Sequence, residues 1–216
     1  MPKSAQRAAP AVVTANILIA AARLFRERGV AGTPTREIAK AAGVLPGSLH
    51  YRYPTKERLL LAVLERAMAQ LTASVERAVA ISRDPMTRLR LALRAHLRDL
   101  LGADDSVYVL LYEWRALSDA AMEEWLATRR RYEQLFVQLL DEAVAVLPLR
   151  REVDLFLLRQ FVFGAVNQVA MWRRPGGPSI ERIADQFFRL VAFGALDLAP
   201  LPLPPLPPDP GVPACD

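Results

Sequence analysis

The segment TPTREIAKAAGVLPGSLHYRYPTK, from Thr33 to Lys56, holds a set of residues at fixed spacing. Counted from Thr35, it has a small residue at the fifth position, Ala39, and a glycine at the ninth, Gly43. A helix-turn-helix needs both, because its helices cross closely at the fifth position and its turn requires a positive φ at the ninth. The fourth, tenth and fifteenth positions hold the apolar residues that fill the joint between the helices, namely Ile38, Val44 and Leu49. The spacing therefore predicts a helix-turn-helix.

Outward from this segment, helical periods dominate the chain, and no stretch shows sustained alternation of apolar and polar residues. The sequence therefore predicts an all-α fold of about nine helices. Glycines, prolines and capping residues place these helices near residues 14–28, 34–42, 46–51, 56–81, 85–102, 104–117, 119–147, 151–173 and 180–196. Thr33, Thr55 and Ser179 are the expected N-caps of the helices that follow them. The closing proline-rich residues, 199–216, are expected to form a disordered tail.

Composition argues for a nucleic-acid partner and against an enzyme. Residues 1–58 hold ten Lys and Arg but three Glu, a net charge of +7, whereas the whole chain carries +5. A basic end on a neutral remainder is typical of a DNA-binding protein. The one cysteine, Cys215, cannot assemble a Cys-based metal site, and the two separated histidines, His50 and His96, leave little material for other metal or catalytic chemistry. We therefore expect no enzymatic activity, no metal and no cofactor.

The N-terminal residues imitate a secretory signal. Lys3 and Arg7 precede an uncharged run of fifteen residues, Ala8 to Ala22. Polar residues interrupt this run, however, and its helical stripe continues directly into the charged segment RLFRERG. The next longest uncharged run, Gln160 to Trp172, has thirteen residues, and spanning a bilayer takes roughly 20. We expect a cytoplasmic protein without a membrane segment. A secreted or membrane-associated helical protein that uses the N-terminal run is the alternative.

The stretch from Thr14 to Leu64 resembles the DNA-binding head of the TetR family of transcriptional regulators. The family pattern runs AA..LF...G, T...IA..AGV and GTLYYHF.SKE.L, and this chain reads AARLFRERG, TPTREIAKAAGV and GSLHYRYPTKERL. The resemblance implies a three-helix head at residues 14–58 after a flexible N-terminus at 1–13. It also implies an all-α ligand-binding and dimerisation body at residues 59–198. The implied function is that of a ligand-responsive repressor.

The resemblance also implies which side chains meet double-stranded DNA. The residues that would face the major groove are Thr35, Arg36, Pro46, Gly47, Ser48 and Tyr51, and those that would meet phosphates are His50, Arg52 and Lys56. Arg36 is the best candidate for a guanine contact, and Tyr51 could contact a thymine methyl group. His50 stands where the family usually has tyrosine. Leu45 stands where a serine or threonine cap is common, so the third helix is expected to begin uncapped.

The last two predicted helices are apolar almost all round, which indicates a partner surface. The resemblance implies a two-fold dimer that sets two heads on a palindromic operator. The candidate interface residues are Phe156, Phe161, Phe187 and Val191. Complete burial of these helices inside one subunit is the alternative.

A small hydrophobic effector is implied by the same resemblance. The candidate effector residues lie in the middle helices and in the helix that follows them, namely Arg94, His96, Tyr112, Trp114, Trp125, Asn167, Gln168 and Trp172. The segment GAVNQVAMWRRPGG resembles the pattern G..N....W.RP.G of members that respond to acyl-CoA thioesters. An acyl-CoA would then place its anionic end near Arg173 or Arg174. Each candidate could instead pack within the core, and drug or flavonoid effectors fit the same architecture.

Overall fold

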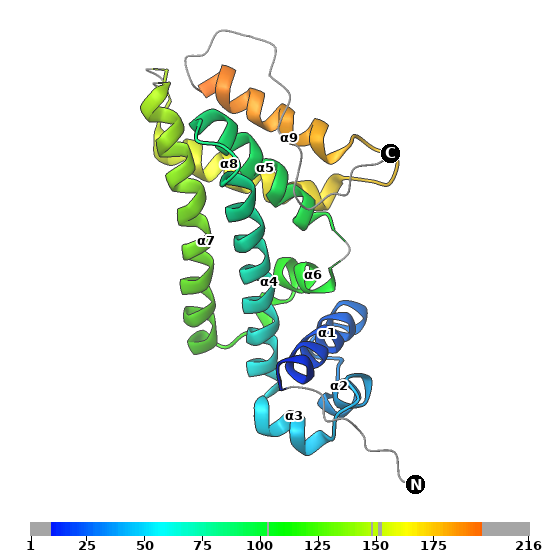
Figure 1. Cartoon of the computed structure of the whole chain (residues 1–216). Coiled ribbons are helices and arrows are strands. Elements are labelled where there is room, and N and C mark those ends of the chain that lie inside the picture. The colour runs from blue at the N-terminus through cyan, green and yellow to red at the C-terminus, as the bar shows by residue number, and fades with distance from the viewer. Residues whose placement is uncertain (1–9, 103, 148, 151–152, 196–216) are drawn as a thin grey trace. The chain divides into compact units, whose positions relative to one another are not determined.

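The computed structural model describes residues 10–102, 104–147, 149–150 and 153–195. Within these residues the chain forms helices and no strand (Figure 1). The α-helices are α1 (Pro10–Arg28), α2 (Thr35–Ala41), α3 (Pro46–Arg52), α4 (Lys56–Val79), α5 (Pro85–Leu100), α6 (Asp105–Tyr112), α7 (Asp119–Val146), α8 (Leu155–Trp172) and α9 (Ile180–Arg189). A 3-10 turn, η1 (Trp114–Ala116), follows α6, and a π-helical turn, η2 (Leu190–Ala195), continues α9. The predicted all-α fold of about nine helices is confirmed. The predicted tail at 199–216 lies outside the described residues.

The described residues form two compact units. We call the described residues within 1–69 and 103–128 the head unit, and those within 70–102 and 129–216 the body unit. The head unit contains α1, α2, α3, α6 and η1, and the body unit contains α5, α8, α9 and η2. The long helices α4 and α7 have residues in both. The domain boundaries expected from the sequence remain predictions.

In the head unit, α1 begins at Pro10 rather than at Thr14. Residues 10–13, which the resemblance places in a flexible N-terminus, form its first turn. A proline is well suited to a first turn because no hydrogen bond is needed from its nitrogen. The apolar stripe of α1, which includes Ile17 and Phe25, is fully buried, and α1 contacts both α2 and α6. The helix ends at Gly29, whose φ is +71°.

The expected capping role of Thr33 is wrong. The residue before α2 is Pro34, and no side chain caps this helix. The Thr33 side chain is instead fully buried, and its hydroxyl lies 2.8 Å from the Gly29 carbonyl oxygen and 3.2 Å from that of Leu24. The hydroxyl therefore bonds to backbone carbonyl oxygens at the end of α1 and in the turn that follows, rather than to the amides of α2.

The turn between α2 and α3 depends on Gly43, whose φ is +67°. The Val44 N–H donates to the Ala39 carbonyl over 3.0 Å, and the Gly43 N–H donates to the Lys40 carbonyl over 3.2 Å. This pair of bonds is the Schellman motif, which ends a helix at a left-handed residue. Leu49 of α3 is 3% exposed and anchors the short helix to the head. The helix-turn-helix predicted from the spacing is therefore present.

The two expectations about capping around α3 are confirmed. Leu45 precedes α3 and supplies no side-chain hydrogen bond to its free amides. Thr55 precedes α4 and accepts a hydrogen bond from the Arg58 N–H over 3.1 Å. Helix α3 thus begins without a side-chain cap, whereas α4 begins with one.

Helix α6 also packs against α1. Arg26 donates to Asp105 over 2.8 Å, and its guanidinium lies 5.3 Å from the centre of the Tyr108 ring. The Glu113 carboxylate, directly after α6, accepts a hydrogen bond of 3.0 Å from the N–H of Val30. These contacts join both ends of α6 to the last turn of α1 and to the turn that follows it.

In the body unit, α5 packs against α8 and α9. Arg90 of α5 is 8% exposed and makes two hydrogen bonds to Asp185 of α9, of 2.7 and 2.8 Å. A bidentate pair of this kind fixes the orientation of both side chains. It therefore sets the register of α9 along α5.

A buried polar network joins α5, α7 and α8. The His96 ring is 2% exposed, and its Nδ1 lies 2.7 Å from the Tyr132 hydroxyl while its Nε2 lies 3.2 Å from Oδ1 of Asn167. Since Oδ1 of an amide can only accept, Nε2 carries the proton and Nδ1 accepts from the hydroxyl. Burial lowers the pKa of His96 to about 4, against a smaller raising effect from its bond to Asn167. Burial also raises the pKa of Tyr132, so both rings are neutral near pH 7.

Because burial lowers the pKa of His96, the free energy of unfolding should fall as the pH falls. Unfolded His96 binds a proton below about pH 6.5, whereas folded His96 binds one only below about pH 4. The unfolded state therefore gains protons first, and the free energy of unfolding falls as the pH falls from 6.5 to 4, by at most ~3 kcal/mol from this group. Urea unfolding across this range should show a steeper loss for the wild type than for His96→Gln. Parallel profiles for the two proteins would contradict the buried neutral ring.

Candidate functional site

The outward face of α3 is open to solvent. Leu49 is buried, and a period of 3.6 residues places Gly47 and Tyr51 on the opposite side of the helix. Tyr51 is 88% exposed, and no atom lies within 4 Å of where a Cβ on Gly47 would stand. All the residues that the resemblance assigned to the major groove are exposed, namely Thr35, Arg36, Pro46, Gly47, Ser48 and Tyr51. The helix-turn-helix therefore presents these side chains together on an accessible surface.

The basic residues around this face differ in how they are held. Arg36 is exposed, and no carboxylate among the described residues pairs with it. Arg52 donates to the Thr14 hydroxyl over 3.0 Å. The Lys56 ammonium donates to the carbonyl oxygens of Ala31 and Thr33, at 3.1 and 3.4 Å. Lys56 therefore also closes the turn between α1 and α2. The phosphate contacts of His50, Arg52 and Lys56 remain predictions.

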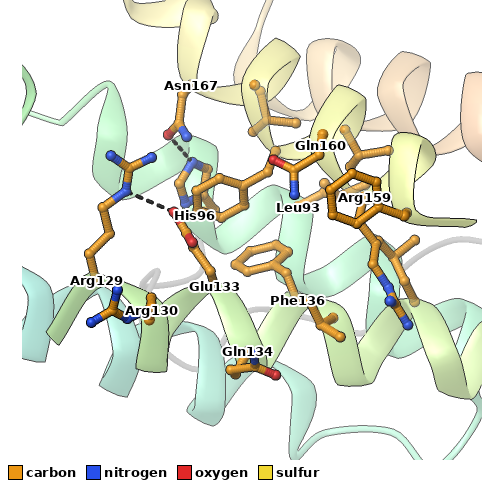
Figure 2. Close-up of a pocket in the computed structure, with 17 residues that line it drawn as sticks. Leu93, His96, Arg129, Arg130, Glu133, Gln134, Phe136, Arg159, Gln160 and Asn167 are labelled. Carbon is orange, nitrogen blue, oxygen red and sulfur yellow. Dashed lines mark hydrogen bonds and ion pairs between the residues drawn. The ribbon is translucent and has the colours of Figure 1, made fainter. Parts of the chain in front are cut away.

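A cavity of about 420 Å³ lies in the body unit. Three aromatic rings cluster in its wall: the Phe136 ring centre lies 5.6 Å from those of both His96 and Phe163. Other parts of its wall are aliphatic, from Leu93, Val137, Leu140, Val162 and Val166. Cavities of this size and character hold small, largely apolar molecules. Asn167 and the His96 ring are among the polar groups of the wall, with Gln134, Gln160 and charged side chains elsewhere (Figure 2).

Three arginines line the same cavity. Figure 2 shows Arg129 and Arg130 to one side of Phe136 and Arg159 to the other. Arg129 donates to Glu133 over 2.7 Å, and Arg159 pairs with Asp141. Arg130 is exposed and pairs with no carboxylate among the residues that the structure describes. The cavity thus combines aromatic and aliphatic side chains with polar ones and with one uncompensated cation, Arg130.

The effector residues expected from the sequence do not form one group. His96 and Asn167 line the cavity. Arg94 faces α9 instead, where it pairs with Glu181 over 3.4 Å, and Gln168 is exposed. Trp172 lines a separate hollow of the body unit. Tyr112, Trp114 and Trp125 belong to the head unit and do not line this cavity.

Sequence reasoning missed most of the cavity wall, including Arg130, Gln160 and Phe163. The residues of α7 that line the cavity fall on one helical stripe, namely Arg129, Arg130, Glu133, Gln134, Phe136, Val137 and Leu140. The same periodicity marks a stripe on α8. These stripes could have been found by their spacing of three and four. That they face one another could not, because helix pairing is a tertiary property.

Helix α8 exposes an apolar stripe. Its apolar members are Leu157, Phe161 and Met171, with Phe161 67% exposed, and Gly164 and the polar Gln168 lie between them at intervals of three or four residues. By length and composition α8 could cross a membrane, with a mean hydropathy of 1.2, but the core helices of soluble proteins pass the same test. Only 22% of this helix is buried within the chain. A stripe of this kind is typical of an interface with another chain.

The stripe continues onto α9 and η2, and here one expectation is wrong. Val191 is 4% exposed and is therefore no interface residue. It recurs with Ala184 and Phe188 at intervals of four and three, so it belongs to the stripe that packs into the body unit. Leu190, which is 64% exposed, lies on the outer surface instead. Together with Phe187 and Trp172 it lines a hollow of about 290 Å³.

Comparisons with known proteins agree with these features. A family model described as "Bacterial regulatory proteins, tetR family" matches residues 17–63, and one described as "Tetracyclin repressor-like, C-terminal domain" matches residues 82–195. The transcriptional repressor KstR2 of Mycolicibacterium smegmatis is 28% identical over 187 residues, which cover 86% of this chain and 91% of the relative.

Solved structures show the same likeness. The TetR family regulator PfmR from Thermus thermophilus is 30% identical, with a TM-score of 0.68 over 81% of this chain and 96% of its own. AibR, solved with isovaleryl coenzyme A and operator DNA, is 28% identical, with a TM-score of 0.71 over 82% of this chain and 97% of its own. The family models together span the helix-turn-helix and most of the remaining helices. This chain therefore belongs to the TetR family of transcriptional regulators and is a helix-turn-helix DNA-binding protein.

Proposed function

We propose that this protein is a cytoplasmic, homodimeric repressor that binds a palindromic operator and releases it when an acyl-CoA enters the body unit. It acts as a regulator and not as an enzyme. In this proposal residues 14–58 serve as the DNA-binding domain and residues 59–198 as the ligand-binding and dimerisation domain. The relative KstR2 is named a repressor, and AibR was solved with both an acyl-CoA and operator DNA. These names support the proposal.

The observation that carries the proposed ligand is the cavity with its unpaired Arg130. An apolar space of about 420 Å³ suits an acyl chain. A free guanidinium at its edge suits the phosphate groups of coenzyme A, since arginine binds phosphate through two parallel hydrogen bonds. Arg173 and Arg174, which the sequence favoured for this role, do not line the cavity. We therefore assign the anionic end of the ligand to Arg130.

The proposed dimer uses the exposed stripe of α8 together with Phe187 and Leu190. A two-fold axis would pair this surface with its own copy, as isologous interfaces require. Phe161 is its most exposed phenylalanine, and Gly164 would let two α8 backbones approach closely. Phe156, which is 62% exposed, stays in this proposal at the edge of the surface.

The proposed switch is a shift between populations of conformations. Helices α4 and α7 are continuous and have residues in both units, so a change at the cavity wall on α7 can reach the head along unbroken helices. The ligand would favour a dimer whose two heads no longer fit adjacent major grooves. A tenfold preference for that form shifts the equilibrium by about 1.4 kcal/mol, which is enough for partial release.

For DNA recognition, we expect Arg36→Ala to weaken operator binding by about 1–3 kcal/mol and to relax the base preference at one position in each half-site. Fluorescence anisotropy with DNA from upstream of the gene measures both effects. Arg83→Ala removes the same charge from an exposed position of the body unit and should leave affinity unchanged. Wild-type affinity should also fall steeply with salt. An affinity that does not change with salt would contradict the proposed interface.

For the dimer, we expect Phe161→Arg to weaken association by at least about 100-fold, because each of two symmetry-related phenylalanines contributes roughly 1.5–3 kcal/mol when buried. Sedimentation equilibrium measures this change. Val12→Arg places the same charge on an exposed apolar position of α1 and should leave the dimer intact. A wild type that sediments as a monomer at micromolar concentration would count against the interface.

For the ligand, a panel of acyl-CoAs of increasing chain length should release the wild type from its operator, whereas coenzyme A alone should not. We expect Arg130→Ala to raise the acyl-CoA concentration needed for release about tenfold, as loss of a charge-assisted bond predicts, with unchanged affinity for DNA. Arg83→Ala again serves as the control. If free fatty acids release the protein from its operator at the same concentrations, the phosphate groups of coenzyme A are not needed and the role proposed for Arg130 is wrong.

A further inference from the structure

The two most exposed large apolar or aromatic side chains of the described residues lie in α3 and directly before it. Tyr51 is 88% exposed and Leu45 is 78% exposed, while the exposed leucines of the body unit reach 64%. A tyrosine keeps a polar hydroxyl in water, but a leucine gains nothing from exposure. The exposure of Leu45 therefore calls for an explanation in the bound state.

Leu45 has no structural role through its side chain. Its backbone carbonyl begins α3, accepting from the N–H groups of Ser48 and Leu49 at 2.9 and 3.2 Å. Any residue supplies that carbonyl, and a serine or threonine would also cap the helix. The leucine side chain neither caps α3 nor enters the core of the head. Its position at the N-terminal end of the reading helix is where such helices contact base edges.

The exposed face of α3 offers few other hydrogen-bonding groups. Pro46 and Gly47 have none in their side chains, and Ser48 has a single hydroxyl. Arg52 is held by the Thr14 hydroxyl. None of the exposed side chains on the outward face of α3 can form the paired hydrogen bonds by which arginine, asparagine or glutamine distinguish guanine and adenine. Single hydroxyl bonds from Ser48 and Tyr51 and apolar contact are the base contacts that this face can supply.

The major groove has one apolar group that identifies a base, the C5-methyl group of thymine. We propose that Leu45 reads thymine: its side chain packs against the C5-methyl group of one thymine in each half-site of the operator. A leucine at this position leaves α3 without a side-chain cap in the free protein, but in the complex it distinguishes thymine from the other bases. This inference rests on the proposed binding of a palindromic operator, and it assigns a specificity residue that is separate from Arg36.

The test removes only the methyl group. After footprinting on upstream DNA has located the operator, each thymine is replaced by deoxyuridine, symmetrically in both half-sites, and affinity is measured for each duplex. We expect one symmetric pair of replacements to weaken wild-type binding about 15-fold, because a buried CH₂-sized group contributes about fourfold per site. With Leu45→Ala the same replacement should cost less than twofold. Leu45→Ser, which restores a cap, should show the same insensitivity.

The controls separate this inference from the proposed function. Ile81→Ala removes an exposed apolar side chain from the body unit and should keep the full deoxyuridine effect. Leu45 is exposed, so both of its variants should fold, and circular dichroism checks this. If no deoxyuridine replacement matters, or if Leu45→Ala is as sensitive as the wild type, Leu45 does not read thymine although the operator is bound. If the wild type does not prefer upstream DNA over random DNA, the proposed operator binding fails as well.

Discussion

The left-handed backbone at Gly43 is the constraint on which the head depends. A φ of +67° is available to glycine without steric cost, and it lets the amides of Gly43 and Val44 close α2 while the chain turns toward α3. Leu49 then becomes buried, and the period of the helix leaves Gly47 and Tyr51 facing outward. A side chain at Gly43 would be strained whatever space surrounds it. The outward orientation of Gly47 and Tyr51 therefore depends on the conformational freedom of Gly43.

The body depends on a different constraint, the need to satisfy buried polar groups. His96 lies among aromatic rings, where burial lowers its pKa and keeps it neutral, and both of its nitrogens have partners, one on α7 and one on α8. The Arg90 and Asp185 pair connects α5 to α9 in the same way. These specific bonds fix three helices around the central one, and the cavity is the space that they leave between α5, α7 and α8.

Sequence reasoning worked best where short-range rules apply. The glycine at the ninth position of the motif, the cap at Thr55 and the uncapped start of α3 all follow from residue type and spacing. It failed at Thr33 because a threonine before a proline reads as a cap, whereas burial turned its hydroxyl toward α1. It failed at Val191 because an apolar helix has several candidate faces, and only packing decides which one is buried.

The sequence by itself determined the all-α fold, the helix-turn-helix and the basic, exposed reading segment, because each of these rests on local periodicity, turn chemistry and charge. Only the tertiary structure decided which residues surround the cavity. Arg130 and Phe136 lie on α7 and Phe163 lies on α8, and they line one cavity because both helices contact α5. Likewise, the structure showed that Arg130 is unpaired while Arg129 and Arg159 have carboxylate partners. Pairing between helices depends on the whole arrangement of side chains, which no local pattern contains.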